Sequence, residues 1–451
     1  MLTLIALMVT AATAAWLLIE LKDGPERHLI FLMFALWLRY ALSAFPEYTF
    51  DPVVAGVTIN ALGALATVGV GFLIIDRKAF LLRPVLPLYI FLVAVFFSNV
   101  LNGQIIPLIT GGSRFLYLLV ITLAAYLALL KNGPTVVCKK LLPAFMLPVS
   151  LQIVSVGLGI EKRGVVSYEQ AESTGRNYVG TFSHESDFSL ILLAALFVSI
   201  LWTDRGKLFY LVSLCVLGAG MMLANYRTAI LATAPFMIAG ALQLVEYVEP
   251  KFRGLTRTVS VGLILAVVMV GPNQDELVGR FSDLGEVSNL DFFREPASVN
   301  EQERDLLTGR YYIWVNYISA WRDEDPVHRT FGRGTDSWEE QFRLYAHNAF
   351  VSYLYEYGWF GLLMFGAYWV HFLSMCGAAS IASRKPIYIL GGLGFTILAC
   401  ATMPLWQISG AILLGLIGGA VMYELAMERE RRASGLAPAT AAHGLPAGSV
   451  R

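Results

Sequence analysis

The sequence predicts an all-α polytopic membrane protein with about 12–13 transmembrane helices. Its composition is 57% hydrophobic and only 15% charged, whereas soluble domains carry about 25% charged residues. The apolar residues gather in runs of about 20, the length that an α-helix needs to cross a bilayer. One long polar segment, 272–346, interrupts these runs and predicts a single large loop outside the membrane.

The charge balance and the cysteines exclude several other classes of protein. The chain holds 33 Lys and Arg against 33 Asp and Glu, so its net charge is zero and it has no basic footprint for nucleic acid. Its four cysteines lie in or beside apolar runs, outside the polar segment. Their positions, Cys138, Cys215, Cys376 and Cys400, predict neither a disulfide framework nor a metal-binding spacing.

The apolar runs define the predicted elements in order. They fall at 1–20, 28–45, 52–75, 84–101, 114–131, 141–160, 186–203, 208–224, 228–246, 258–271, 348–375, 387–404 and 409–426. We therefore expect transmembrane helices 1–10 within 1–271, the large loop with an amphipathic helix at 272–346, and transmembrane helices 11–13 within 347–426. The tail 427–451 is predicted to be disordered, because its end is rich in Ala, Gly, Pro and Ser.

The first apolar run allows a second interpretation. Residues 11–15 (AATAA) resemble a signal-peptidase site, and cleavage would remove one span. The run has no basic segment before it, and Lys22 and Arg27 follow it. We therefore expect an uncleaved helix whose C-terminal end is cytoplasmic.

Basic residues are concentrated in alternate connecting segments, which the positive-inside rule assigns to the cytoplasm. These residues are Lys22, Arg27, Arg77, Lys78, Arg83, Lys131, Lys139, Lys140, Arg205, Lys207, Lys251, Arg253, Arg257, Arg384, Lys385, Arg429, Arg431 and Arg432. The intervening segments 46–51 and 405–408 contain no Lys or Arg. The pattern predicts an outer N-terminus, a cytoplasmic C-terminus and an outer or periplasmic loop at 272–346.

Arginines at the predicted outer face are candidates for binding an anion. They are Arg114, Arg176, Arg227 and Arg310, and several of them lack a matching acid nearby in the sequence. Guanidinium groups fit phosphate or diphosphate oxygens, although single arginines also reach lipid headgroups. Arg39 lies in the middle of a span, where a buried ion pair or a headgroup contact is the expected role.

The segment that begins at Arg310 has the spacing of an amphipathic helix. Trp314, Tyr317 and Trp321 follow Arg310 at intervals of four, seven and eleven residues, which places all four on one helical face. A cation beside an aromatic stripe is typical of a helix at the boundary between water and lipid.

His347 stands just before an apolar run and is the candidate general base. An imidazole there can accept a proton from a hydroxyl group near neutral pH. The alternative is a histidine that hydrogen-bonds the start of the helix. Glu339, Glu340 or Glu356 could orient the ring, and the sequence does not choose among them.

Two further patterns are weaker. Asp323-Glu324-Asp325 has the D-x-D form of metal-dependent sugar transferases, but Pro326 follows it and a solvated turn is the preferred interpretation. Gly332-Arg333-Gly334 is too short for a dinucleotide motif, and the chain contains no P-loop. We therefore expect no metal, no nucleotide and no other cofactor.

Several segments, taken in order, resemble the O-antigen ligase and Wzy-type polysaccharide polymerase superfamily. The segments are GRNYVGTFSHESDFSLIL (175–192), NYRTAIL (225–231), TGRYYIW (308–314), TFGRGTDSWEEQF (330–342) and AHNAFVSYLYEYGWFGLL (346–363). The resemblance covers about 172–375. It departs from the family at 183–187, where Ser-His-Glu-Ser-Asp replaces a frequent Pro-Asn pair.

This resemblance implies a GT-C-like glycosyltransferase of the bacterial inner membrane that acts at the periplasmic face. The donor would be a glycan on polyprenyl (undecaprenyl) diphosphate, and the acceptor a glycan or a lipid A-core type molecule. Arg227 and Arg310 match the diphosphate-binding arginines, with Arg176 as a further candidate, and His347 matches the proposed base of an inverting, metal-independent transfer. Asn348, Trp314 and Glu356 would support the site.

Different functions remain open from the sequence. A polymerase and a ligase share the segments above, and either could work with other polysaccharide assembly proteins. A transporter or flippase of a lipid-linked glycan is the alternative class, but it would place its charges within the spans and show repeated halves. A non-catalytic scaffold would not need His347.

Overall fold

The structure, a computed structural model, describes residues 2–54, 57–162, 177–202, 204, 206–245, 248–258, 261–262, 290–307 and 309–435. These residues are almost entirely helical, apart from a hairpin of β1 (Pro52–Val54) and β2 (Val57–Thr58). Seven of the described helices are long and apolar enough to cross a membrane. The predicted all-α polytopic membrane fold is therefore confirmed.

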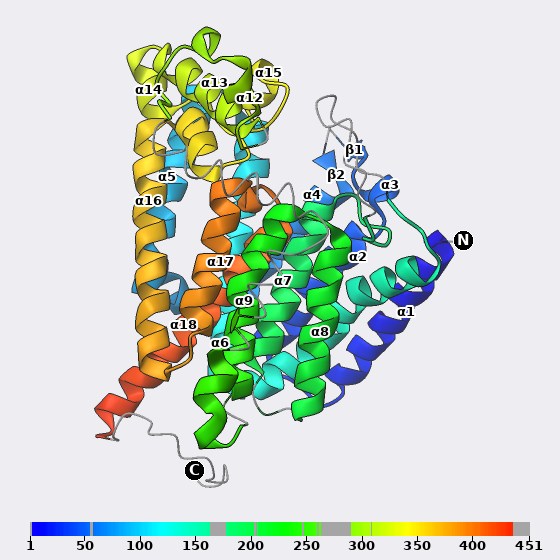
Figure 1. Cartoon of the computed structure of the whole chain (residues 1–451). Helices are drawn as coiled ribbons and strands as arrows, with labels where there is room; N and C mark the ends of the chain where they lie inside the picture. Colours follow the sequence, from blue (N-terminus) through cyan, green and yellow to red (C-terminus); the bar gives the residue numbers. More distant parts are fainter. Residues whose placement is uncertain are drawn as a thin grey trace.

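The helices form a bundle and a smaller group at one end of it (Figure 1). The bundle helices are α1 (Leu2–Leu21), α2 (Arg27–Ser43), α4 (Ile59–Ile74), α5 (Leu86–Leu101), α6 (Ile105–Gly157), α7 (Glu185–Leu201), α8 (Lys207–Ala224), α9 (Arg227–Val245), α16 (Ala349–Ser383), α17 (Ile387–Ala401) and α18 (Ile408–Ala433). The polar segment contributes α12 (Glu301–Asp305), α13 (Arg310–Arg322), α14 (Pro326–Phe331) and α15 (Trp338–Gln341). The short α3 (Pro46–Thr49) follows α2, and the 3₁₀ turn η6 (Pro404–Trp406) joins α17 to α18.

Every predicted span except 258–271 coincides with a described helix. That run lies largely outside the described residues, as do Arg176 and the tail beyond 435. The prediction of a disordered tail from 427 is wrong for its first residues, because α18 continues to Ala433. The two predicted spans 114–131 and 141–160 belong to one element, α6, because the helix resumes after a bend at Gly133 (φ 75°). Pro134 follows this residue and lacks the N–H that an unbroken helix would need.

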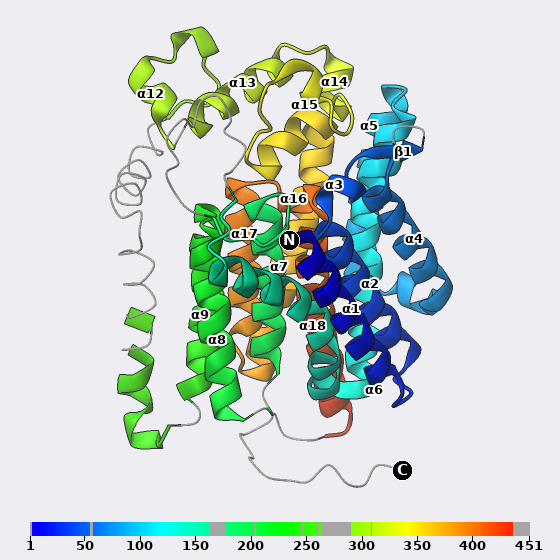
Figure 2. The ribbon, with the colours of Figure 1, turned by 90° about the vertical axis from the view of Figure 1, so that its right-hand side faces the viewer.

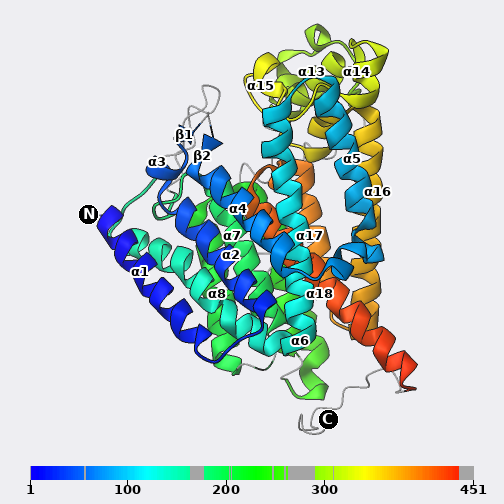
Figure 3. The same cartoon turned by 180° about the vertical axis from the view of Figure 1, so that it is seen from behind.

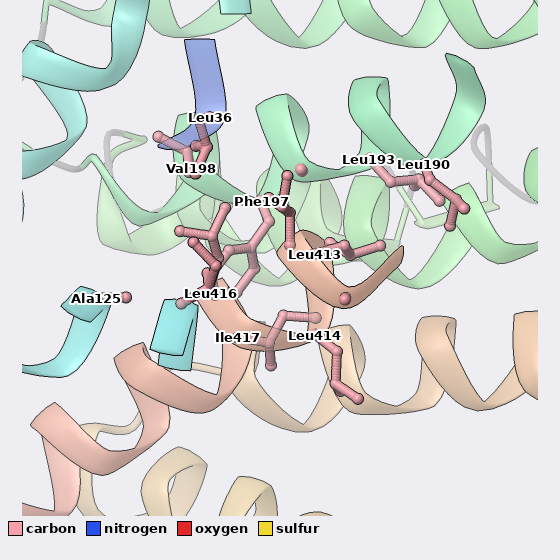
Figure 4. Packing of buried hydrophobic residues seen from close by; sticks show 14 of the residues in the cluster. Leu36, Ala125, Leu190, Leu193, Phe197, Val198, Leu413, Leu414, Leu416 and Ile417 are labelled. Atoms are coloured by element: carbon pink, nitrogen blue, oxygen red, sulfur yellow. The ribbon is translucent and has the colours of Figure 1, made fainter. Parts of the chain in front are cut away.

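The core is built around α18, which packs against α6 and α7. Figure 4 shows Leu413 and Leu416 of α18 near Phe197 of α7. Small residues let the backbones of α18 and α6 approach: a Cβ added to Gly419 would lie 2.6 Å from the Cβ of Ala125. Close packing of this kind replaces the hydrophobic driving force that is missing between helices in lipid.

Segments predicted to share a side of the membrane do contact one another. Lys140 pairs with Glu20 over 2.7 Å, and Arg27 pairs with Asp76 over 2.5 Å. These contacts gather the ends of α1, α4 and the bend of α6. At the opposite end, α5 and the first turns of α6 extend to α13, α14 and α15 (Figure 3).

Arg39 has the buried ion-pair role expected of it. Its guanidinium lies 3.8 Å from a carboxylate oxygen of Asp187 on α7, and its side chain is only 6% exposed. It also donates a hydrogen bond to Asn60. Charge and hydrogen bonding therefore tie α2 to α4 and α7, and this arginine is already engaged within the bundle.

Candidate functional site

The glycine-rich turn at 330–336 docks against a bend in α16. Gly358 has φ 67° and interrupts the helix, which leaves carbonyl groups before it without helical partners. Gly334 N donates to the carbonyl of Glu356 over 2.8 Å. A Cβ on Gly332 would lie only 2.2 Å from that carbonyl oxygen, so a larger residue would prevent the contact. The glycines of the 330–342 motif therefore serve backbone packing.

Helix α13 holds the chain that leads to His347. Trp314 Nε1 donates to the carbonyl of Ala346 over 2.8 Å, and Tyr317 Oη donates to that of Leu344 over 2.9 Å. The predicted shared face exists, but it packs on this segment, with Tyr317 only 1% exposed. The indole N–H of Trp314 and the hydroxyl of Tyr317 on this face are thus satisfied by backbone carbonyls of the protein, and the position of the helix at the boundary between water and lipid stays a prediction.

His347 occupies a constrained position between α15 and α16. Its φ of 49° is unusual for a residue other than glycine, and its ring lies 3.9 Å from the ring of Tyr345, centroid to centroid. Nδ1 is buried without a hydrogen-bond partner among the described residues. Asn348 begins α16 by accepting hydrogen bonds from the N–H groups of Phe350 and Val351.

The surroundings of His347 keep its imidazole neutral. Burial, together with the nearby positive charges of Arg310 and His184, lowers the pKa of His347 from its ordinary value to about 3. Burial removes the water that would stabilise the charged imidazolium, and the neighbouring positive charges repel it. Both effects favour the neutral form. A neutral imidazole is the form that can accept a proton, and the lowered pKa makes His347 a weaker base in the free protein than a solvated histidine.

Arg310 and Arg227 lie at the N-terminus of α9. Arg310 Nη2 donates to Thr228 Oγ1 over 3.3 Å. Arg227 directly precedes Thr228 and is the first residue of α9. Only Asn225, in the left-handed conformation, and Tyr226 separate α9 from α8. Two guanidinium groups at the positive end of a helix make a setting that favours an anion. Figure 2 shows α13 beyond the ends of α9 and α17.

Arg114 has a different role from the one predicted. Its two terminal nitrogens each lie 3.1 Å from a carboxylate oxygen of Asp336. The acid is distant in sequence, so the apparent lack of a partner was misleading. Glu356 accepts a hydrogen bond from Ser352 over 3.0 Å and lines a small pocket beside Arg114. Glu339 and Glu340 are exposed on α15.

The acidic run at 323–325 is tied up in local structure. Asp325 begins α14 by accepting a hydrogen bond from Val327 N over 2.8 Å, and it also contacts the ring of His328. Both Glu324 oxygens accept from Arg333, over 2.8 and 2.6 Å. Glu324, Asp325 and His328 are close enough to share a metal ion. Asp325 caps α14 and Glu324 pairs with Arg333, which fits the interpretation of this run as a turn.

The structure adds residues that the sequence did not single out. Tyr345 contacts the ring of His347, and Trp406 of η6 lies 5.8 Å from the ring of Tyr345. Asp336 accepts from Trp406 Nε1 over 2.9 Å. Asp336 belongs to the 330–342 motif and Tyr345 stands just before the 346–363 motif, but Trp406 is 59 residues beyond His347 and carries no pattern of its own.

Comparison with known proteins gives one family match. The model of the O-antigen ligase family matches residues 208–366, which include Arg227, Arg310 and His347. The match covers less than half of the chain and leaves out Arg114 and Trp406. No curated protein matches the chain.

Proposed function

We propose that the chain, whose residues 208–366 match the O-antigen ligase family, transfers a glycan from a polyprenyl diphosphate carrier to an acceptor hydroxyl. The family match supports a function of the ligase or polymerase type. The proposed donor is undecaprenyl diphosphate-linked, the acceptor is a glycan or a lipid A-core type molecule, and the reaction occurs at the periplasmic face of the inner membrane.

The observation that carries this proposal is the hydrogen bond from Arg310 to Thr228. It joins the polar segment to the N-terminus of α9, whose first residue is Arg227. Donor diphosphate oxygens would accept hydrogen bonds from both guanidinium groups, which bind phosphate oxygens through two-pronged contacts. As the sugar leaves, negative charge grows on the diphosphate, and fixed cations stabilise that charge.

His347 is the proposed general base. Nδ1 is buried without a hydrogen-bond partner among the described residues, and we assign the proton transfer from the acceptor to Nε2. The acceptor O–H bond breaks and its proton passes to the imidazole, while the oxygen forms a bond with the anomeric carbon. The bond from that carbon to the diphosphate oxygen breaks, and its electron pair stays on the diphosphate. Attack opposite the leaving group inverts the anomeric configuration, and no metal or nucleotide is required.

Envelope glycans from cells lacking the gene test the proposal and separate its two variants. Loss of long chains with retention of short units indicates a polymerase, whereas accumulation of lipid-linked polymer indicates a ligase. Complementation with the native gene is the positive control, and complementation with His347→Ala is the matched inactive variant. Unchanged glycans and unchanged lipid-linked intermediates in the deleted strain would refute glycan transfer.

A further inference from the structure

We infer that the ion pair between Arg114 and Asp336 acts, through Trp406 and Tyr345, to position His347 for catalysis. This inference rests on the proposed function, because it assigns positioning residues for the same transfer reaction. A continuous series of contacts runs from α6 to the candidate base.

The first contact fixes Asp336 to the bundle. Arg114 holds both carboxylate oxygens at 3.1 Å, and the two side chains are 20% and 19% exposed. Such a two-pronged pair defines direction as well as distance. The neighbouring turn is equally constrained: Thr335 N donates to Asn99 Oδ1 over 3.1 Å, and a Cβ on Gly111 would lie 2.3 Å from the Thr335 side chain.

The second contact passes from Asp336 to Trp406. Trp406 Nε1 donates to Asp336 Oδ1 over 2.9 Å, and the Arg114 guanidinium carbon lies 5.6 Å from the centre of the indole ring. The indole is therefore held by a hydrogen bond at its edge and by a cation near its ring. Trp406 belongs to η6, so this contact also joins the α17–α18 connection to the polar segment.

The third contact reaches the candidate base. The rings of Trp406 and Tyr345 are 5.8 Å apart and inclined by 32°, and those of Tyr345 and His347 are 3.9 Å apart and inclined by 34°. Trp338 packs against both Tyr345 and Trp406, at 6.1 and 5.9 Å. With one face against Tyr345, the imidazole has few orientations left. A displacement of about 1 Å at a reacting group can lower a rate by about 100-fold.

The pair has features of a positioning unit and not of a donor-binding site. Both carboxylate oxygens of Asp336 are engaged by Arg114, so the pair has no net charge with which to attract a diphosphate. Asp336 also has φ 59°, a conformation that aspartate and asparagine tolerate better than most residues. The left-handed backbone of Asp336 and its ion pair together hold its carboxylate against Arg114 and Trp406.

Asp336→Asn and Trp406→Leu test the inference in purified full-length protein. Asp336→Asn keeps the acceptor for Trp406 and tolerates the left-handed backbone but removes the charge that faces Arg114. Trp406→Leu removes the ring that supports Tyr345. The substrate is the lipid-linked glycan extracted from cells lacking the gene, and the readout is release of polyprenyl diphosphate. Binding is measured with undecaprenyl diphosphate alone, and detergent monodispersity reports folding.

We expect both variants to lower turnover by about 10- to 100-fold while the donor KM and undecaprenyl diphosphate binding change less than twofold. In a His347→Ala background, Asp336→Asn should cause no further loss, because the base that it positions is already missing. Trp406→Phe keeps a ring and should retain more activity than Trp406→Leu. Glu324→Gln is the matched control, since it breaks another two-pronged pair in the same turn, and it should leave turnover within twofold of native.

Native turnover in both Asp336→Asn and Trp406→Leu would overturn the inference while leaving the proposed function intact. An equal loss from Asp336→Asn in the native and His347→Ala backgrounds would also overturn it, because the residue would then act independently of His347. If His347→Ala itself turns over at the native rate, the assignment of the base fails, and the positioning role fails with it.

Discussion

Arg310 Nη2 donates a hydrogen bond to Thr228 Oγ1 over 3.3 Å, across 82 residues of sequence. The bond connects α13, which also holds the segment before His347 through Trp314, with the N-terminus of α9, where Arg227 lies. The proposed diphosphate site and the proposed base thus share one helix as their support.

Substitution of the arginines should impair donor binding. Arg227→Lys and Arg310→Lys keep the charge but lose the two-pronged geometry, so we expect weaker binding of undecaprenyl diphosphate and slower transfer. Arg227→Ala and Arg310→Ala should weaken both further, by about tenfold or more per lost charge-assisted contact. Arg333→Ala is a suitable control because its guanidinium pairs with Glu324. Native binding by both alanine variants would assign these arginines to lipid headgroups.

The pH dependence should reflect a base that is already neutral. The pKa of His347 is lowered to about 3 by burial and nearby positive charge, so acidification from pH 7.5 to 5.5 leaves the imidazole unprotonated in the free protein. We expect kcat/KM for the donor to fall less than about twofold over this range. An exposed histidine with a pKa of about 6.5 would lose about tenfold at pH 5.5. A loss of that size, absent from His347→Ala, would contradict the buried neutral base.

Labelling should report the predicted orientation. A cysteine at Ser298, which is exposed in the polar segment, should react with a membrane-impermeant thiol reagent in intact spheroplasts. A cysteine at Ser383, at the end of α16, should react only after the membrane is opened. Both are placed in a background from which the four native cysteines have been removed. Reversed labelling would invert the topology.

Removal of metal ions should not affect the reaction. The carboxylates of Glu324 and Asp325 already bind Arg333 and cap α14, and a diphosphate leaving group needs no metal when arginines stabilise it. Transfer in EDTA should therefore equal transfer in buffer alone. Loss of activity in EDTA with recovery on adding a divalent cation would instead implicate the cluster of Glu324, Asp325 and His328.

The sequence predicts the helices better than it predicts the partners of their side chains. Apolar run length locates the spans, because lipid requires long stretches of satisfied backbone. It does not reveal that Asp336 pairs with Arg114, since the two lie 222 residues apart. Aromatic spacing correctly places Trp314 and Tyr317 on one face, but only the fold shows that backbone carbonyls of Ala346 and Leu344 cover it.

The motifs at 225–231, 308–314 and 346–363 indicate the site because each contains a residue at the start of a helix, and such a position depends on the neighbouring sequence. Arg227 begins α9, Arg310 begins α13 and Asn348 caps α16. The supporting contacts of His347 could not be found in the same way. Trp406 stands in a short connection after α17, and nothing in its own neighbourhood links it with Tyr345.

Single-turnover transfer by His347→Ala, measured beside undecaprenyl diphosphate binding, is the most direct test of the proposed reaction. His347 lies outside the packed helix seams, so the variant should remain monodisperse in detergent. We expect turnover to fall by about 100- to 10,000-fold, the usual contribution of a general base, with diphosphate binding nearly unchanged. Transfer at the native rate by a correctly folded His347→Ala protein would contradict the account.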